Sequence, residues 1–359
     1  MTDRSSTTAG SQPALLELDD VTTIFGHGAN ATWASDHVSL RIEENPPRIV
    51  SVVGESGSGK TTAARALLGL QPPTSGKALW RGKDIYSLSR QELLDFRREV
   101  QVVFQDPYGI FNPYYPIDRV FTMTIKKFKL AKSKDEANRL IEEALKAVNL
   151  RPPDVLGRYP HQLSGGERQR VMLARAYLVK PKVIVADEAI SMLDVAVRAV
   201  IMNILLDFKE QLGISTIFIT HDLSAAYYLG GDIMVMQRGR AVELGPSVSV
   251  MDNPKHPYTK LLLESIPSPD PDQRWDTAAI PASELDEIGE SRRGSRNRCL
   301  FAERCPYVRD ECWARRPPRY LVGEQEVACV LYAEVPRNDG TLALEEVAAA
   351  QGGVTASVR

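Results

Sequence analysis

The stretch RIVSVVGESGSGKTTAARALLGL, residues 48–70, decides the fold of this chain. It opens with a nearly continuous apolar run, as expected of a buried strand, and passes through GESGSGKT at 54–61 into a helical run. This order of strand, loop and helix is the context that a phosphate-binding P-loop requires. Its glycines leave backbone N–H groups uncovered for a phosphate, and the N-terminus of the following helix adds partial positive charge.

The P-loop pattern assigns roles to its polar residues. We expect Lys60 to reach the β- and γ-phosphates of a nucleotide and the Thr61 hydroxyl to bind Mg²⁺. The other candidate nucleotide-binding residues of the loop are Gly54, Ser56, Gly57, Ser58, Gly59 and Thr62.

Short apolar runs alternate with helical patterns from Leu15 to about Pro254, which predicts an α/β fold. The clearest strands are 48–54, 182–187, 215–220 and 232–237, and their continuous apolar character is typical of buried parallel strands. Residues 133–150 show helical spacing of apolar side chains, with Ser133 as the predicted cap and Pro152 as the predicted stop.

A second acidic element ends the strand at 182–187. Asp187 is well placed to hold Mg²⁺, and the adjacent Glu188 can act as general base toward the water that attacks the γ-phosphate. Such a pair alone is weak evidence, because loop carboxylates are usually solvated. Together with the P-loop it predicts a site for nucleotide hydrolysis.

The composition excludes several classes of protein. The chain has 359 residues, 25% charged and 43% hydrophobic, with a formal net charge of −2. This gives no reason to expect a nucleic-acid partner, and no apolar run approaches the length of a membrane span. The polar start lacks the apolar stretch of a secretory signal. We therefore expect a cytosolic chain with reduced thiols.

The residues LSGGERQR at 163–170 resemble the signature of the ATP-binding cassette (ABC) family, and the resemblance extends over 15–255. It implies a core sheet that is mostly parallel, with an antiparallel β subdomain and a helical subdomain. It also implies that Ser164, Gly165 and Gly166 clamp the γ-phosphate of ATP bound to an opposite subunit. Two cassettes would then sandwich ATP head to tail.

Further residues match the family in order. Gln105 is similar to the glutamine that senses Mg²⁺ and γ-phosphate, Asp194 to the D-loop aspartate, and His221 to the switch histidine. Phe25 would stack on adenine, although Trp33 lies close by in the sequence. A lone histidine or phenylalanine would more often belong to a core. Glu167 and Ala189 depart from the usual glutamine and proline, and neither change removes a catalytic group.

The segment NPKHPYTKLLLESIP at 253–267 resembles the tail of ATP-binding subunits of oligopeptide and dipeptide importers, a group with nickel and oligosaccharide members. The resemblance implies two membrane permeases, a second ATPase subunit, an extracytoplasmic solute-binding protein and a place on the cytoplasmic face of the membrane. Peptide is the default solute. The stretches 191–199 and 219–232 are more similar to oligosaccharide importers.

All four cysteines fall near the end of the chain, as C-x5-C-x6-C-x16-C: Cys299, Cys305, Cys312 and Cys329. The importer resemblance implies a 4Fe-4S cluster, and four thiolates suit either such a cluster or structural zinc. Zinc sites usually pair their cysteines more closely, and four unrelated free thiols remain an alternative. Nine arginines between Arg292 and Arg319 could offset the charge of a cluster or meet phosphates.

The predicted organisation places a disordered leader at 1–13 and the nucleotide-binding domain at 14–255, with a helical subdomain at about 106–175. A tail and linker follow at 256–280, a cysteine-rich region at 281–335 and a second tail at 336–359. The predicted function is ATP hydrolysis that powers an importer. The alternative is a soluble iron–sulfur ABC ATPase with a redox or nucleic-acid role, which co-purification with membrane proteins would distinguish.

Overall fold

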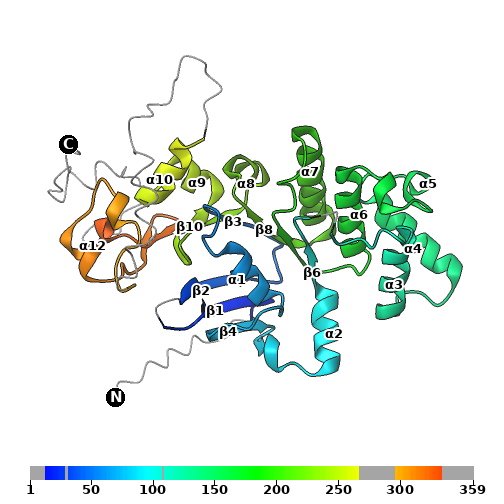
Figure 1. The fold of residues 1–359 in the computed structure, drawn as a ribbon, viewed down its shortest axis with the longest axis horizontal. Coiled ribbons are helices and arrows are strands. Elements are labelled where there is room, and N and C mark those ends of the chain that lie inside the picture. Colours follow the sequence, from blue (N-terminus) through cyan, green and yellow to red (C-terminus); the bar gives the residue numbers. More distant parts are fainter. Residues whose placement is uncertain (1–12, 29–30, 107–108, 267–295, 334–359) are drawn as a thin grey trace, which may run out of the picture. The chain divides into compact units, whose positions relative to one another are not determined.

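The computed structural model describes residues 13–28, 31–106, 109–266 and 296–333 (Figure 1). The predicted leader up to 12, the linker from 267, the cysteine-rich region up to 295 and everything from 334 lie outside the described residues. The chain divides into two units. The first comprises Met1–Thr23, Ser35–Val50 and Thr61–Thr220, and the second comprises Ile24–Ala34, Ser51–Lys60 and His221–Arg359.

An antiparallel sheet in the order β2-β1-β4-β5 lies mainly in the first unit. Its strands are β1 (Leu16–Phe25), β2 (Thr32–Ile42), β4 (Ser75–Trp80) and β5 (Lys83–Asp84). Leu16 faces Trp80 and Leu18 faces Ala78, so their apolar side chains share the buried face. The register shifts between Asp19 and Thr22.

The first unit also contains the parallel strands β6 (Val100–Val103), β7 (Val183–Asp187) and β8 (Ser215–Thr220). Every residue of β7 and β8 is buried. β3 (Ile49–Val53) begins beside β8, where the Thr216 N–H donates to the Arg48 carbonyl at 2.8 Å. β3, β7 and β8 confirm the predicted buried strands to within one residue at each end, whereas β6 was not among the predicted strands.

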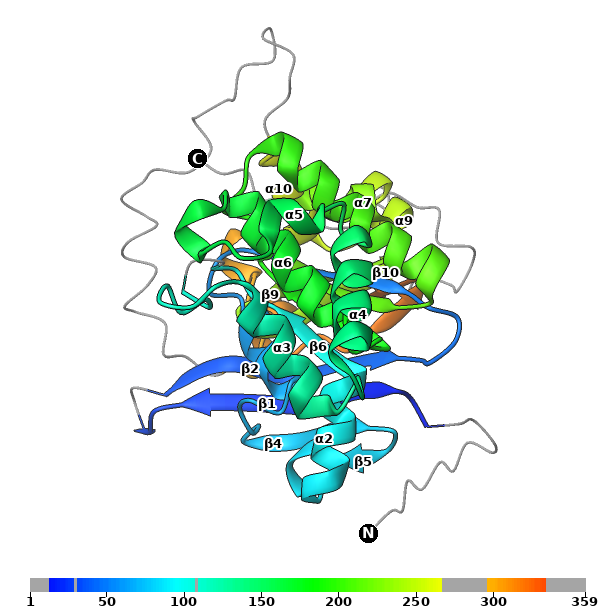
Figure 2. The same ribbon diagram turned by 90° about the vertical axis from the view of Figure 1, so that its right-hand side faces the viewer.

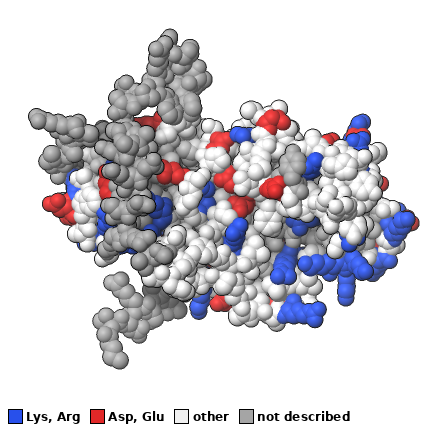
Figure 3. All heavy atoms as spheres, in the orientation of Figure 1, with Lys and Arg blue, Asp and Glu red and all other residues white. Residues whose placement is uncertain are grey.

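The helices of the first unit are α1 (Lys60–Leu67), α2 (Arg90–Glu99), α3 (Asp118–Phe128), α4 (Lys134–Lys146), α5 (Pro152–Val155), α6 (Gly165–Tyr177) and α7 (Val195–Leu212). α3, α4, α5 and α6 lie together (Figure 2). Figure 3 shows positive side chains gathered over this helical part, where Lys126 and Lys127 stand in the last turn of α3. Cations there complement the negative end of a helix.

The predicted helix at 133–150 is shorter in the structure. Ser133 caps α4 as expected, accepting the Glu136 N–H at 3.1 Å. The helix ends at Lys146, and Asn149 then adopts a left-handed φ of 58° that leaves the helical path. Pro152 does not merely stop the helix, because it starts α5, where a proline at the first position costs no hydrogen bond.

The second unit contains the antiparallel strands β9 (Asp232–Gln237), β10 (Arg240–Pro246), β12 (Gln325–Val327) and β11 (Tyr320–Val322), side by side in that order. β9 does not follow the predicted parallel pattern on this side, because a two-residue turn joins it to β10. Both turn residues have positive φ, 45° at Arg238 and 89° at Gly239, as such hairpins require. The helices are α8 (Leu223–Leu229), α9 (Ser247–Asp252), α10 (Pro257–Glu264) and α12 (Asp310–Ala314).

One core in the second unit joins the end of β3 to the C-terminal segments. Val53, Val235, Tyr258 and Phe301 are buried in the same cluster, and Cys299 and Cys305 pack against it. Short 3-10 helices complete the two units at Ile85–Ser87, Pro160–Gln162, Ala302–Arg304 and Val330–Tyr332. Among the residues that the structure describes, no helix has both the length and the apolar character that crossing a membrane demands.

Candidate nucleotide-binding site

The P-loop is held in shape by close backbone packing. A Cβ atom at Gly54 would collide with the Met236 carbonyl oxygen, and one at Gly59 with that of Ala34, so both positions require glycine. Gly57 has a φ of 77° and nothing within 4 Å of its missing Cβ. The loop is therefore packed at its ends and open at its middle, as a phosphate cradle must be.

Lys60 lies inside the loop, with 6% of the residue exposed. Its Nζ donates to the carbonyl oxygens of Gly54 at 2.8 Å and Glu55 at 2.9 Å. Ser58 is also buried, and its carbonyl accepts the Gly239 N–H at 2.8 Å, while Ser56 is exposed. The amine thus stands at the loop that a phosphate would enter, held by neutral oxygens that a phosphate can replace.

The two predicted Mg²⁺ ligands that lie farthest apart in sequence meet in the first unit. The Thr61 hydroxyl, in the first turn of α1, donates to Asp187 Oδ1 at 3.1 Å. Asp187 ends β7 and is 8% exposed. Thr62 follows on α1 and is half-buried. A hydroxyl and a carboxylate are oxygen ligands of the kind that Mg²⁺ prefers, so the pair fits this ion.

Glu188 has an unusual backbone. Its φ is 50°, in the left-handed region that most residues avoid. Its N–H donates to the Ile219 carbonyl at 2.9 Å, and its own carbonyl accepts the Ser191 hydroxyl at 2.9 Å. Strained residues held by such partners are concentrated at functional sites, which supports the prediction for Glu188. The next residue, Ala189, is buried.

Gln105 is exposed in the loop after β6, and the residues before it are tied to α6. The Gln169 side-chain amide donates to the Phe104 carbonyl at 3.2 Å, and Arg175 donates to the Val102 carbonyl at 2.8 Å. Sequence analysis missed Gln169 and Arg175. Gln169 is buried and Arg175 is half-buried, and polar side chains among the apolar residues of this helix were the available signal.

The signature residues form the N-terminus of α6. Ser164 is the exposed N-cap, and its hydroxyl both accepts the Glu167 N–H at 3.2 Å and donates to Glu167 Oε2 at 2.8 Å. The Ser164 N–H also donates to this carboxylate and lowers the pKa of Glu167. The S-x-x-E spacing of a capping box was visible in the sequence. Gly165 is half-buried, and a Cβ at Gly166 would lie 2.5 Å from Val197 Cγ1.

The remaining predicted residues lie at separate ends of elements. Asp194 caps α7 by accepting the Val197 N–H at 3.0 Å, and His221 is exposed after β8. Phe25, at the end of β1, is 42% exposed. The Arg296 guanidinium lies 5.4 Å from the centre of the Trp33 ring and occupies one of its faces. Phe25 is therefore the better candidate for stacking on adenine.

The four cysteines converge in the second unit without forming a disulfide. Cys312 and Cys329 are buried, Cys299 and Cys305 are half-buried, and the Cys299 N–H donates to the Cys312 carbonyl at 2.8 Å. Burial raises the pKa of all four thiols. In each of the six possible pairs of these cysteines, negative charge on one thiolate raises the pKa of the other thiol. The thiols are thus mutual neighbours.

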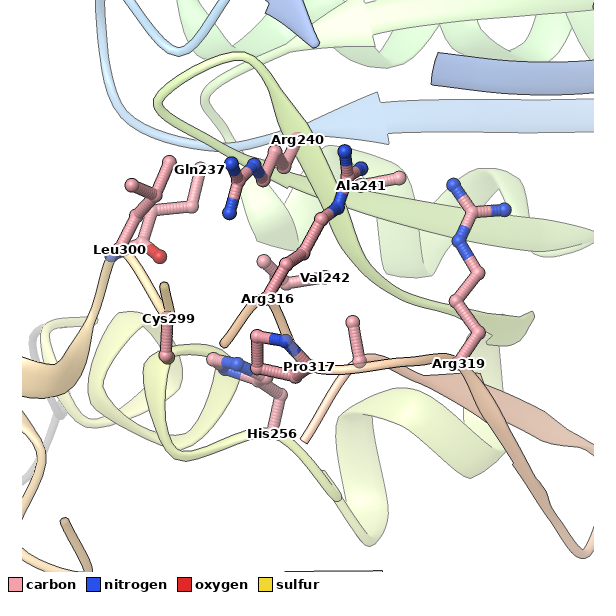
Figure 4. A pocket seen from close by; sticks show the side chains of 11 residues that line it. Gln237, Arg240, Ala241, Val242, His256, Cys299, Leu300, Arg316, Pro317 and Arg319 are labelled. Atoms are coloured by element: carbon pink, nitrogen blue, oxygen red, sulfur yellow. The ribbon is translucent and has the colours of Figure 1, made fainter. Parts of the chain in front are cut away.

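The metal prediction for these thiols is not supported by the arrangement of their side chains. Over the described ranges, no three His, Cys, Asp or Glu side chains are placed so that they could hold a metal ion. Positive charge is nonetheless available to thiolates. A cavity of about 40 Å³ beside Cys299 and His256 is lined by Arg240, Arg316 and Arg319 (Figure 4). The charge of Arg240 opposes the rise in the pKa of Cys299.

Two known protein families match segments of this chain. The family described as "ABC transporter" matches residues 36–191, and "Oligopeptide/dipeptide transporter, C-terminal region" matches residues 242–312. The oligopeptide transport ATP-binding protein OppF of Salmonella typhimurium is 36% identical over 84% of this chain and 92% of its own length. The di/tripeptide transport ATP-binding protein DppF of Pseudomonas aeruginosa is 37% identical over 82% and 89%.

A solved structure shares the cassette fold. It is a dimeric post-hydrolysis state of the ATP-binding cassette MJ0796 bound to ADP and Pi, 30% identical to this chain, with a TM-score of 0.57. The match covers 65% of this chain and 98% of that one. The chain therefore has the predicted P-loop cassette fold.

Proposed function

This chain belongs to the ABC family of oligopeptide and dipeptide transport ATP-binding subunits, and from that premise we propose that it hydrolyses ATP to drive peptide uptake through separate permeases. Its enzymatic activity is that of a transport-coupled ATPase. The observation that carries the site assignment is the Thr61–Asp187 hydrogen bond, which joins the P-loop helix to the acidic strand end.

In this proposal each side chain has one task. Backbone N–H groups of the P-loop and Lys60 would bind the phosphates, while Thr61, Asp187 and Gln105 would hold Mg²⁺. When bound, Mg²⁺ neutralises charge on the phosphate oxygens. Glu188 takes the proton of the attacking water. His221 contacts the γ-phosphate, and Phe25 stacks on adenine.

A second cassette completes the site. The exposed Ser164 at the N-terminus of α6 suits a phosphate that another subunit brings, because a helix N-terminus attracts anions. Asp194 would face the same interface. The partner is a second copy or a sister subunit. ATP binding would close the pair, and hydrolysis would reopen it.

The first unit of this chain has a groove on which a permease could dock. A groove of about 160 Å³ is lined by residues that include Phe111, Tyr115 and Val120. Ile110 and Met123 on its rim are 43% and 58% exposed. We expect Met123→Glu to abolish co-purification with the permeases while leaving ATP hydrolysis by the isolated chain unchanged. If Met123→Glu still co-purifies with the permeases, this groove is not the docking surface.

Peptide is the proposed solute because the names of the relatives specify oligopeptides and di/tripeptides. The resemblance of 191–199 and 219–232 to oligosaccharide importers finds no support there. The test is transport by the assembled complex on the cytoplasmic face of the membrane. Peptide-loaded solute-binding protein should stimulate ATP hydrolysis, and an oligosaccharide-loaded one should not. Stimulation by neither, with no permease bound, would favour the soluble iron–sulfur ATPase with a redox or nucleic-acid role.

We further propose that the four cysteines hold a 4Fe-4S cluster with a structural role. The support for this proposal is four free thiols in the second unit, the number and ligand type that such a cluster takes, although no three of them are arranged to hold a single ion. Zinc–sulfur bonds of about 2.3 Å would demand tighter convergence, whereas a four-iron cluster is larger. About four irons and four sulfides per chain, lost in Cys305→Ser with Cys312→Ser, are expected after anaerobic purification. About one zinc, or no metal, would refute the cluster.

A further inference from the structure

The C-terminal segments contact the P-loop directly at Glu55. The Glu55 N–H donates to the Tyr258 hydroxyl at 3.2 Å, although 203 residues separate them. Arg304 Nη1 lies 3.5 Å from Glu55 Oε1. Tyr258 belongs to α10, and Arg304 immediately precedes Cys305. Two parts of the C-terminal region thus hold the backbone and the side chain of one P-loop residue.

Glu55 in turn positions the groups that would bind phosphate. Its carbonyl accepts Lys60 Nζ at 2.9 Å and the Ser58 N–H at 3.1 Å. A shift of the Glu55 peptide would therefore displace the lysine amine and the turn of the loop together. Small displacements matter here, because phosphate binding depends on aligned N–H groups.

The contacts to Glu55 rest on a rigid aromatic group. The Tyr258 ring is fully buried and packs edge-on against Phe301, with centroids 5.6 Å apart. The Arg304 guanidinium lies 5.8 Å from the centre of the Phe301 ring. Phe301 shares its core with Val53 at the end of β3, and Cys305 packs against that core. The cysteine-containing region and the P-loop are therefore built on one set of packed side chains.

We infer that Tyr258 and Arg304 are positioning residues of the P-loop, through which the folded cysteine-containing region sets the affinity for nucleotide. This inference rests on the proposed ATPase function and adds a role for the C-terminal region in it. The alternative is that the same contacts only stabilise the fold. The two interpretations make different predictions when variants of equal thermal stability are compared. Only the positioning role predicts weaker nucleotide binding.

The test uses the full-length chain and the dissociation constants of Mg-ATP and ADP. Tyr258→Phe removes one hydrogen bond and should weaken both affinities about two- to tenfold. Arg304→Gln removes a partly exposed ion pair and should weaken them about two- to fivefold. KM for ATP should rise while kcat changes little, because the chemistry itself is untouched.

Matched controls come from the same region. Tyr332→Phe removes a hydroxyl that donates to the Lys255 carbonyl at 2.9 Å, and Arg319→Gln removes a cation 3.9 Å from Glu326. Among the described contacts, neither Tyr332 nor Arg319 contacts the P-loop. Both variants should therefore lose a similar amount of thermal stability and keep their affinity for nucleotide. Glu55→Gln combined with Arg304→Gln should be no weaker than either alone.

The outcomes separate the inference from its premise. If wild type binds ATP, Lys60→Ala binds it more weakly, and Tyr258→Phe and Arg304→Gln behave like their controls, the contacts only stabilise the fold and the inference is wrong. Additive losses in the Glu55 and Arg304 pair would also overturn it for Arg304. If the wild-type chain itself binds no ATP, the proposed function fails first.

Discussion

The P-loop and the signature segment are the two proposed phosphate-binding helix starts, and this chain builds them in opposite ways. The P-loop is packed against the backbone of other segments, and its Lys60 is buried. Ser164 of the signature is exposed, and its hydrogen bonds go to Glu167 and Arg168, three and four residues away in the first turn of the same helix. The chain fixes the first site with long-range contacts and the second with local ones.

The difference matches what each site must meet. A loop that binds its own nucleotide gains affinity from being preformed. A helix end that meets a phosphate carried by another subunit must instead stay accessible, so local capping is the support available to it. Substitutions in the two segments should consequently separate binding of ATP from its enclosure between subunits.

The largest effect is expected for Glu188→Gln. This variant tests hydrolysis of ATP that is bound by both the P-loop and the signature segment. Loss of a general base should slow turnover about a thousandfold, while ATP binding persists and the closed pair accumulates. Phosphate release and light scattering with ATP measure the two. Glu210→Gln, an exposed change on α7, is the control. Undiminished hydrolysis would refute the base assignment.

Lys60→Ala tests the preformed site alone. Losing a buried cation that reaches the phosphates should weaken ATP affinity about ten- to hundredfold at any protein concentration. Equilibrium binding of a fluorescent ATP analogue measures this, with the exposed Lys77→Ala on β4 as the control. Unchanged affinity would count against the P-loop role of Lys60 and would remove one side of the comparison.

Ser164→Ala tests the locally capped site. ATP binding by dilute single chains should be unchanged, whereas ATP-dependent pairing should weaken about fivefold through the lost hydrogen bond. The lost cap should also cost about 1 kcal/mol of stability. Ser133→Ala at the cap of α4 should give the same stability loss without the pairing defect. Equal pairing defects in both variants would mean that only helix stability matters.

The smallest effect is expected for Glu167→Gln. Removing a carboxylate beside the incoming phosphate should strengthen ATP-dependent pairing about two- to threefold. The Ser164 N–H lowers the pKa of Glu167, so the carboxylate's capping contribution is present above the unfolded-state pKa and is lost as pH falls through the lowered value. The variant should lack this acid-side loss in melting curves. Glu92→Gln, in the capping box of α2, controls for pairing.

Local sequence was sufficient wherever one segment determines its own structure. The run from Ile49 to Leu67 encodes its strand and helix through unbroken apolar residues and glycines. The Ser133 cap was predictable for the same reason. The proximity of Thr61 and Asp187 followed from family resemblance and from the rule that parallel strands end at one edge of a sheet.

Contacts between distant segments that no known motif marks were not predictable from the sequence. Nothing in the spacing of 253–267 indicated that Tyr258 accepts a hydrogen bond from Glu55, because side-chain pairing across 203 residues leaves no local pattern. The antiparallel pairing of β9 was missed because a strand buried on both faces looks alike in either direction. Arg238-Gly239 was the turn signal that could have revealed it.

The shared core of the second unit has a practical consequence for how the chain can be divided. Tyr258 and Phe301 cover Val53 and Val235, which belong to strands of the cassette. A protein shortened after residue 255 would leave that apolar surface open to water, and such surfaces promote aggregation. The nucleotide-binding segment therefore depends on the C-terminal segments for its solubility. A variant that lacks them would aggregate before any effect on transport could be measured.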